Sequence, residues 1–77
     1  MEFTSTVLYQ QEMAYYNVLT NDGLTFKARL LSQDGDQAFF PKEIILQRVN
    51  HQWVGNADED LIHYLTFDIS RMVKLEE

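Results

Sequence analysis

Apolar and polar positions alternate with a period of two over much of residues 1–55. The alternation is clearest in residues 24–31, where one face carries Leu24, Phe26, Ala28 and Leu30. A period of two is typical of a half-buried β-strand, because successive side chains point to opposite faces of a sheet. Further strands are predicted at residues 14–20, 37–40, 43–49 and 52–54, and Pro41 ends the second of these.

Residues 3–13 carry two conflicting signals. Residues 3–9 are rich in threonine, valine and tyrosine, which favour a strand. Residues 10–13 contain glutamine, glutamate and methionine, which favour a helix. The sequence leaves this region as either strand or helix, so the predicted sheet has four or five strands.

Two turns set the expected strand pairing. A two-residue loop before residues 24–31 would place Asn17 on the apolar face, so we expect a three-residue loop that pairs Val18 with Phe26. In that loop Gly23 takes the left-handed conformation. A tight turn at residues 50–51 is predicted to place Arg48 opposite Trp53 as a cation–π pair.

After residue 56 the apolar positions recur with the period of about 3.6 residues that is typical of a helix. At about 100° per residue, six apolar side chains share one stripe: Leu61, Ile62, Leu65, Ile69, Met72 and Val73. Asn56 is the expected N-cap with Glu59 three residues later, a capping-box spacing. Arg71 and Lys74 lie towards the other end, where the helix dipole favours cations. We expect a helix over about residues 57–74 that covers one face of the sheet.

The expected fold class is α+β: a small antiparallel meander with one C-terminal helix packed on a face. A curled, barrel-like sheet closed by the helix is an alternative that the pattern does not separate. The chain has 77 residues and one proline, with no linker or repeat, so residues 1–77 are predicted to form a single domain, strand-rich over residues 1–55.

Composition narrows the functional classes. The net charge is −6, from six basic and twelve acidic residues, and nucleic acids or anionic membranes require clustered positive charge. No stretch approaches the roughly 18 apolar residues of a membrane span, and the N-terminus lacks a signal-peptide pattern. There is no cysteine to form a disulfide. We expect a cytoplasmic protein that contacts neither nucleic acid nor membrane directly.

No known catalytic or metal-binding pattern is present. His51 and His63 lie on different predicted elements without zinc spacing, and loops starting at Asp34 or Asp58 lack the glutamate that calcium binding needs at position twelve. No serine lies in a nucleophile-elbow motif, and the Ser70 hydroxyl is about 10 Å along the helix from His63. We expect no catalytic residue, no metal and no cofactor.

Surface side chains are the remaining candidates. Phe67 lies about 180° from the apolar stripe, beside His63 and Arg71, and this triplet is the predicted partner contact. The second candidate is an acidic contact made by Asp58, Glu59 and Asp60. A third surface, the sheet face away from the helix, is predicted to mix apolar and cationic side chains, namely Tyr15, Leu19, Leu31, Lys27 and Arg29.

Three functions are compatible with these patterns. The first is a non-enzymatic module that binds another protein or associates with itself. The second is an acidic regulator or inhibitor that occupies a basic site on another protein, which salt would weaken steeply. The third is a small-ligand binder or enzyme with a site between sheet and helix, which requires an internal pocket with convergent polar groups.

Overall fold

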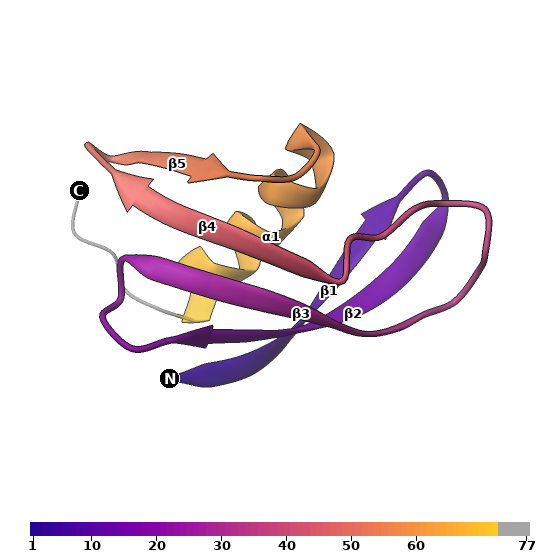
Figure 1. The fold of residues 1–77 in the computed structure, drawn as a ribbon, viewed down its shortest axis with the longest axis horizontal. Helices are drawn as coiled ribbons and strands as arrows, with labels where there is room; N and C mark the ends of the chain where they lie inside the picture. The colour runs from indigo at the N-terminus through magenta and orange to yellow at the C-terminus, as the bar shows by residue number, and fades with distance from the viewer. Residues whose placement is uncertain (73–77) are drawn as a thin grey trace.

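A computed structural model describes residues 1–72 of the chain. The elements follow in the order β1 (Glu2–Tyr9), β2 (Glu12–Thr20), β3 (Thr25–Gln33), β4 (Glu43–Val49), β5 (Gln52–Gly55) and α1 (Glu59–Met72). Each strand pairs antiparallel with the next, so the sheet order is β1-β2-β3-β4-β5. The predicted α+β meander with a C-terminal helix is confirmed, and residues 3–9 are strand (Figure 1).

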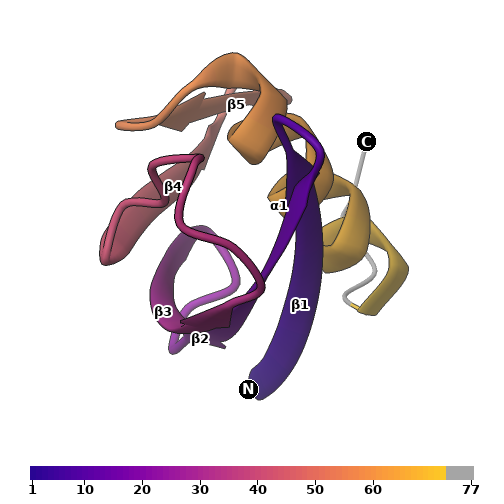
Figure 2. The same cartoon turned by 90° about the vertical axis from the view of Figure 1, so that its right-hand side faces the viewer.

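The sheet curls into a half-barrel, and α1 lies across its open side. Viewed along the long axis, the strands form an incomplete ring, and the helix lies between the two edge strands β1 and β5 (Figure 2). The helix turns its apolar stripe inward, so that Leu61, Leu65 and Ile69 are fully or almost fully buried. The curled sheet, one of the two architectures that the sequence left open, is therefore the observed one.

The core consists of alternate strand residues and the helix stripe. Its buried apolar members are Val7, Ala14, Tyr16, Val18, Phe26, Ala28, Ala38, Phe40, Ile44, Leu46, Leu61, Leu65 and Ile69. Two of them, Ala38 and Phe40, come from the loop between β3 and β4. The strand predicted over residues 37–40 is wrong, because local bonds hold this loop instead: Gln33 donates to the Ala38 carbonyl at 3.3 Å.

Two hairpins have tight turns with positive φ. In the β4–β5 turn the angles are 52° at Asn50 and 64° at His51, and Arg48 pairs with Trp53 as predicted. The guanidinium carbon of Arg48 lies 5.3 Å from the Trp53 ring centroid. The β1–β2 turn has the same geometry at residues 10–11, which was missed because glutamine rarely takes positive φ.

The expected register between β2 and β3 is wrong by two residues. Val18 pairs with Ala28, and Thr20 pairs with Phe26, so the loop is longer than predicted. The inward assignment of Phe26 and Ala28 survives, because a shift of two residues leaves a side chain on the same side. Leu24, which was predicted on the same apolar face, instead lies in the loop before β3 and is 56% exposed. Gly23 does have the expected left-handed conformation, with φ of 75°.

Side-chain bonds stabilise this longer loop. The Asp22 carboxylate accepts hydrogen bonds from the main-chain N–H groups of Leu24 and Thr25, each at 2.8 Å. The Thr20 hydroxyl accepts from the Gly23 N–H at 2.9 Å and donates to the Thr25 carbonyl at 2.8 Å. These bonds satisfy main-chain groups that a shorter loop would place in the ladder.

The helix begins later than predicted. Asp58 is the N-cap, since its carboxylate accepts from the Asp60 N–H at 3.2 Å. Asn56, the expected cap, instead accepts a hydrogen bond from the Ile45 N–H at 3.0 Å. Met72 was predicted to be buried, but it is 54% exposed because it borders a surface groove. The expected helical residues Val73 and Lys74 lie outside the described residues.

Candidate functional site

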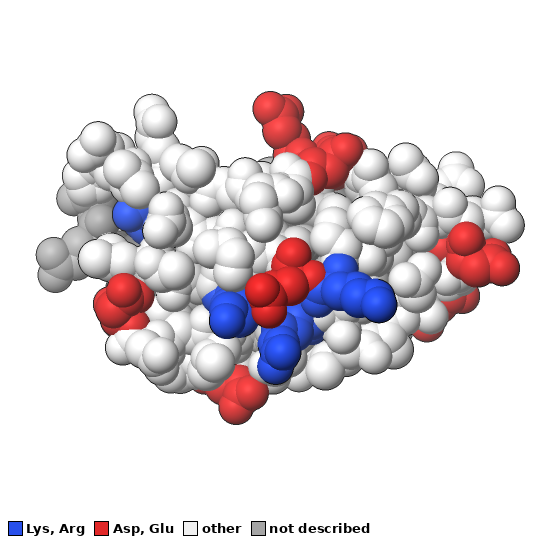
Figure 3. Space-filling model, in the orientation of Figure 1, with Lys and Arg blue, Asp and Glu red and all other residues white. Residues whose placement is uncertain are grey.

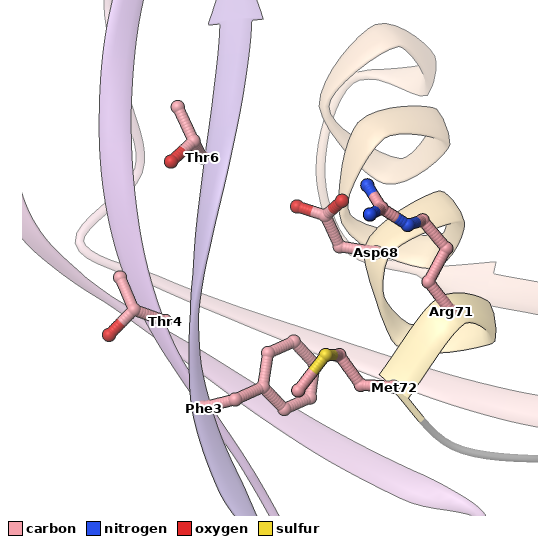
Figure 4. Close-up of a pocket in the computed structure, with 6 residues that line it drawn as sticks. All are labelled: Phe3, Thr4, Thr6, Asp68, Arg71 and Met72. Carbon is pink, nitrogen blue, oxygen red and sulfur yellow. The ribbon is translucent and has the colours of Figure 1, made fainter.

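A surface groove runs between β1 and the C-terminal half of α1. Its volume is about 410 Å³, and it is lined by Phe3, Thr4, Thr6, Asp68, Arg71 and Met72. In Figure 4 the strand forms one wall and the helix the other, and the side chains of Asp68 and Arg71 both extend from the helix. A second hollow of about 370 Å³ lies between the same two elements, near the β1–β2 turn.

Two hydrogen bonds fix the helix against β1. The Ser5 hydroxyl donates to the Asp68 carboxylate at 2.5 Å, and the Tyr9 hydroxyl donates to the Asp58 carboxylate at 2.9 Å. The hydrogen bond to Asp58, reinforced by desolvation and by the negative charge itself, raises the pKa of the Tyr9 hydroxyl. The helix, which forms the wall opposite β1, is therefore hydrogen-bonded to β1 near both of its ends.

The predicted partner contact lies on the outer face of the helix. Phe67 is 56% exposed, and the guanidinium carbon of Arg71 lies 5.8 Å from its ring centroid. His63 is exposed on the same face and packs edge-on against Tyr64, with ring centroids 5.8 Å apart. Arg71 also lines the groove, so the outer face and the groove form one continuous candidate site.

The predicted acidic contact is only partly available. The Asp58 carboxylate already caps the helix and accepts the Tyr9 hydroxyl. Glu59 and Asp60 are exposed in the first turn, where the helix dipole stabilises negative charge. All three acids thus have local structural roles.

The convex face of the sheet, which was predicted to mix apolar and cationic side chains, is open. Leu31 is 58% exposed and Leu19 40% exposed. Two rows of side chains cross this face from β2 to β4: Leu19, Lys27 and Ile45 in one, and Asn17, Arg29 and Glu43 in the other. Figure 3 shows basic atoms gathered around acidic ones near the middle of one face of the molecule.

The cations on the convex face are partly balanced by an acid. The Arg29 Nε lies 3.6 Å from the Glu43 carboxylate, and these side chains are 71% and 44% exposed. An ion pair this open to solvent contributes little to stability. It does reduce the local positive charge that an acidic partner would meet.

One exposed aromatic escaped the sequence analysis. Phe39 is 78% exposed, and it borders a hollow of about 450 Å³ together with Tyr9 and Pro41. The sequence placed it in a short strand, and neither period nor neighbours marked it as a surface residue. Its neighbour Phe40 points into the core and packs edge-on against Tyr9.

Residues 1–72 contain no group of three or more histidine, cysteine or acidic side chains that could hold a metal ion. Within the same residues, no helix is long and apolar enough to cross a membrane. No protein-family model, curated protein or solved structure matches the chain.

Proposed function

We propose that this protein is a non-enzymatic module that binds another protein, or a second copy of itself, through the outer face of α1. The observation that carries the proposal is the exposed Phe67 ring with the Arg71 guanidinium beside it. Aromatic and arginine side chains are the usual anchors of protein interfaces. Because the two already contact one another, less side-chain freedom is lost when a partner covers them.

The adjoining groove supports the same interpretation. A partner that covers Phe67 could extend over Arg71 into the space beside Asp68 and Thr6, where polar groups are available. Interfaces commonly combine an apolar anchor with a polar rim of this kind. Single exposed apolar side chains are ordinary on proteins, so the Phe67 ring carries the proposal only together with the Arg71 guanidinium, and the groove adds support.

The two alternatives have weaker support. For an acidic inhibitor, Asp58 is already engaged, and the helix dipole accounts for Glu59 and Asp60. For a ligand site between sheet and helix, that space is occupied by side chains such as Leu65 and Ile69, which are fully buried. No specific observation among residues 1–72 favours either one over a binding module.

A capture experiment with matched variants tests the proposal. Tagged wild type, Phe67→Ser and Leu24→Ser would be compared for bound proteins by mass spectrometry, because Phe67 and Leu24 are each 56% exposed. We expect a protein held by wild type and Leu24→Ser to be lost with Phe67→Ser. Identical capture by all three would refute a role for the outer helix face. Steep loss of that protein with added salt would instead indicate the acidic mode.

A further inference from the structure

The hydrogen bonds of the first residue define which edge of β1 is unpaired. The Met1 ammonium donates to the Thr20 carbonyl at 2.9 Å, and the Thr20 N–H donates to the Met1 carbonyl at 3.0 Å. Bonded and non-bonded pairs alternate along an antiparallel ladder. The register of β1 with β2 is regular. The residues whose main chain bonds to β2 are therefore Phe3, Ser5, Val7 and Tyr9.

The main-chain groups of the alternate residues point the other way. These residues are Glu2, Thr4, Thr6 and Leu8. Within residues 1–72, no hydrogen bond to another element engages their N–H or carbonyl groups. Thr4 and Thr6 line the groove beside α1, and Figure 4 shows the strand and the helix standing apart there. The unpaired edge of β1 thus borders the groove.

Several of the usual protections against strand pairing are absent from this edge. β1 is eight residues long, contains no proline or lysine, and pairs with β2 without a bulge. Proteins normally guard exposed edges with short strands, lysine, proline, bulges or a covering helix. Here α1 lies beside β1, but the groove separates the two elements where Thr4 and Thr6 line it. The opposite edge of the sheet, β5, is only four residues long. Of the two edges, β1 is the one able to accept another strand.

We propose that the unpaired edge of β1 pairs antiparallel with β1 of a second copy of this chain. Donors and acceptors repeated at every second residue match an extended polypeptide and no other ligand. A second copy brings the same unpaired edge, so a two-fold arrangement satisfies both edges at once. The inference rests on the proposed function, because it names the second copy as the partner at the same groove.

The side chains fit this arrangement. A pairing centred on Ser5 sets Thr4 opposite the second copy's Thr6, and pairs of threonines are favourable across strands. The helical wall beside the edge carries Asp68 and Arg71, one charge of each sign. Each copy carries a net charge of −6, so moderate salt should tighten the association by screening the repulsion.

Sedimentation velocity of the full chain, from micromolar to millimolar concentration, tests the pairing. Wild type is expected to dimerise as its concentration rises. Thr6→Pro removes an edge N–H without touching the β1–β2 ladder, and it should weaken dimerisation by about tenfold or more. Thr6→Ala keeps that N–H and loses only the threonine pairing, so it should dimerise much more tightly than Thr6→Pro. A wild type that stays monomeric throughout, or equal association of Thr6→Pro and wild type, would overturn the proposal.

Amide hydrogen exchange provides a second measurement that needs no substitution, because a proline can also disturb the fold. The N–H groups of Thr4, Thr6 and Leu8 should gain protection as the concentration rises, whereas that of Val7 should be protected throughout. Protection that does not change with concentration would refute the edge pairing. Dimerisation lost with Phe67→Ser but kept with Thr6→Pro would overturn the pairing alone, and would support the proposed function.

Discussion

The Ser5 hydroxyl donates a hydrogen bond to the Asp68 carboxylate, and this bond links the first strand to the last helix across 63 residues. Ser5 is one of the two buried polar residues of residues 1–72, with 1% of its surface exposed. A hydroxyl at such a position is costly unless it is hydrogen-bonded. The pair therefore positions α1 against β1 and fixes one wall of the groove.

Removal of this hydroxyl should loosen the helix. We expect Ser5→Ala to lower the free energy of unfolding by about 1–3 kcal/mol, because the half-buried Asp68 loses its donor. Ser70→Ala, an exposed position on the same helix, is the matched control and should change it by less than about 0.5 kcal/mol. Urea unfolding measures both. Equal values for the two variants would show that the bond contributes nothing.

The helix stripe should contribute strongly to stability. Leu65 has no exposed surface, so Leu65→Ala should lower the free energy of unfolding by about 2–5 kcal/mol through lost burial and a residual cavity. Phe67→Ala, two residues later on the outer face, should stay within about 0.5 kcal/mol of wild type. Chemical denaturation followed by circular dichroism would compare them. A small loss at Leu65 would contradict the packing of α1 on the sheet.

Gly23 offers a test of backbone strain without crowding. A Cβ added there meets no atom within 4 Å, and φ is 75°. Gly23→Ala should therefore destabilise by about 1 kcal/mol through the left-handed backbone alone. Gly23→Asn should cost less, because asparagine tolerates this conformation better. Thermal unfolding of both variants measures the difference, and an alanine variant as stable as wild type would contradict the loop geometry.

Asp22 should make stability depend on acidity. Its carboxylate accepts hydrogen bonds from the main-chain N–H groups of Thr25 and then Leu24, which lower its pKa. A lowered folded-state pKa gives stability above the unfolded-state pKa, and this stability is lost as the pH falls through the folded value. Wild type should therefore exceed Asp22→Ala in stability at neutral pH by more than in acid. A difference independent of pH in urea unfolding would contradict this role.

Tyr16 should make folding stability depend on pH in the alkaline range. Its side chain is fully buried, which raises its pKa to about 12, and its hydroxyl donates to the Pro41 carbonyl at 2.7 Å. The unfolded chain releases this proton near pH 10, about two units lower, so folding stability falls as the pH rises between these values. Tyr16→Phe should lose some stability at neutral pH and show a shallower alkaline decline. Urea unfolding at several alkaline pH values compares the slopes.

Local sequence determined most of the elements and their faces, although residues 37–40 form a loop instead of a strand. The alternation in residues 24–31 predicted β3, and the helical period predicted α1 with Leu61, Leu65 and Ile69 inward. The outward position of Phe67 followed from the same period. These features depend on which side chains can be buried together on one face, and that information lies within each segment.

Tertiary structure decided register, caps and the groove. Asp22 and Thr20 lengthened the β2–β3 loop through hydrogen bonds that no periodicity encodes. Asp58 replaced Asn56 as the helix cap, because Asn56 bonds to β4. The groove requires β1 and α1 to meet across the open half-barrel, where Ser5 reaches Asp68. Contacts so distant in sequence depend on how the whole sheet curls, so segment patterns could predict the sheet and the helix but not the site between them.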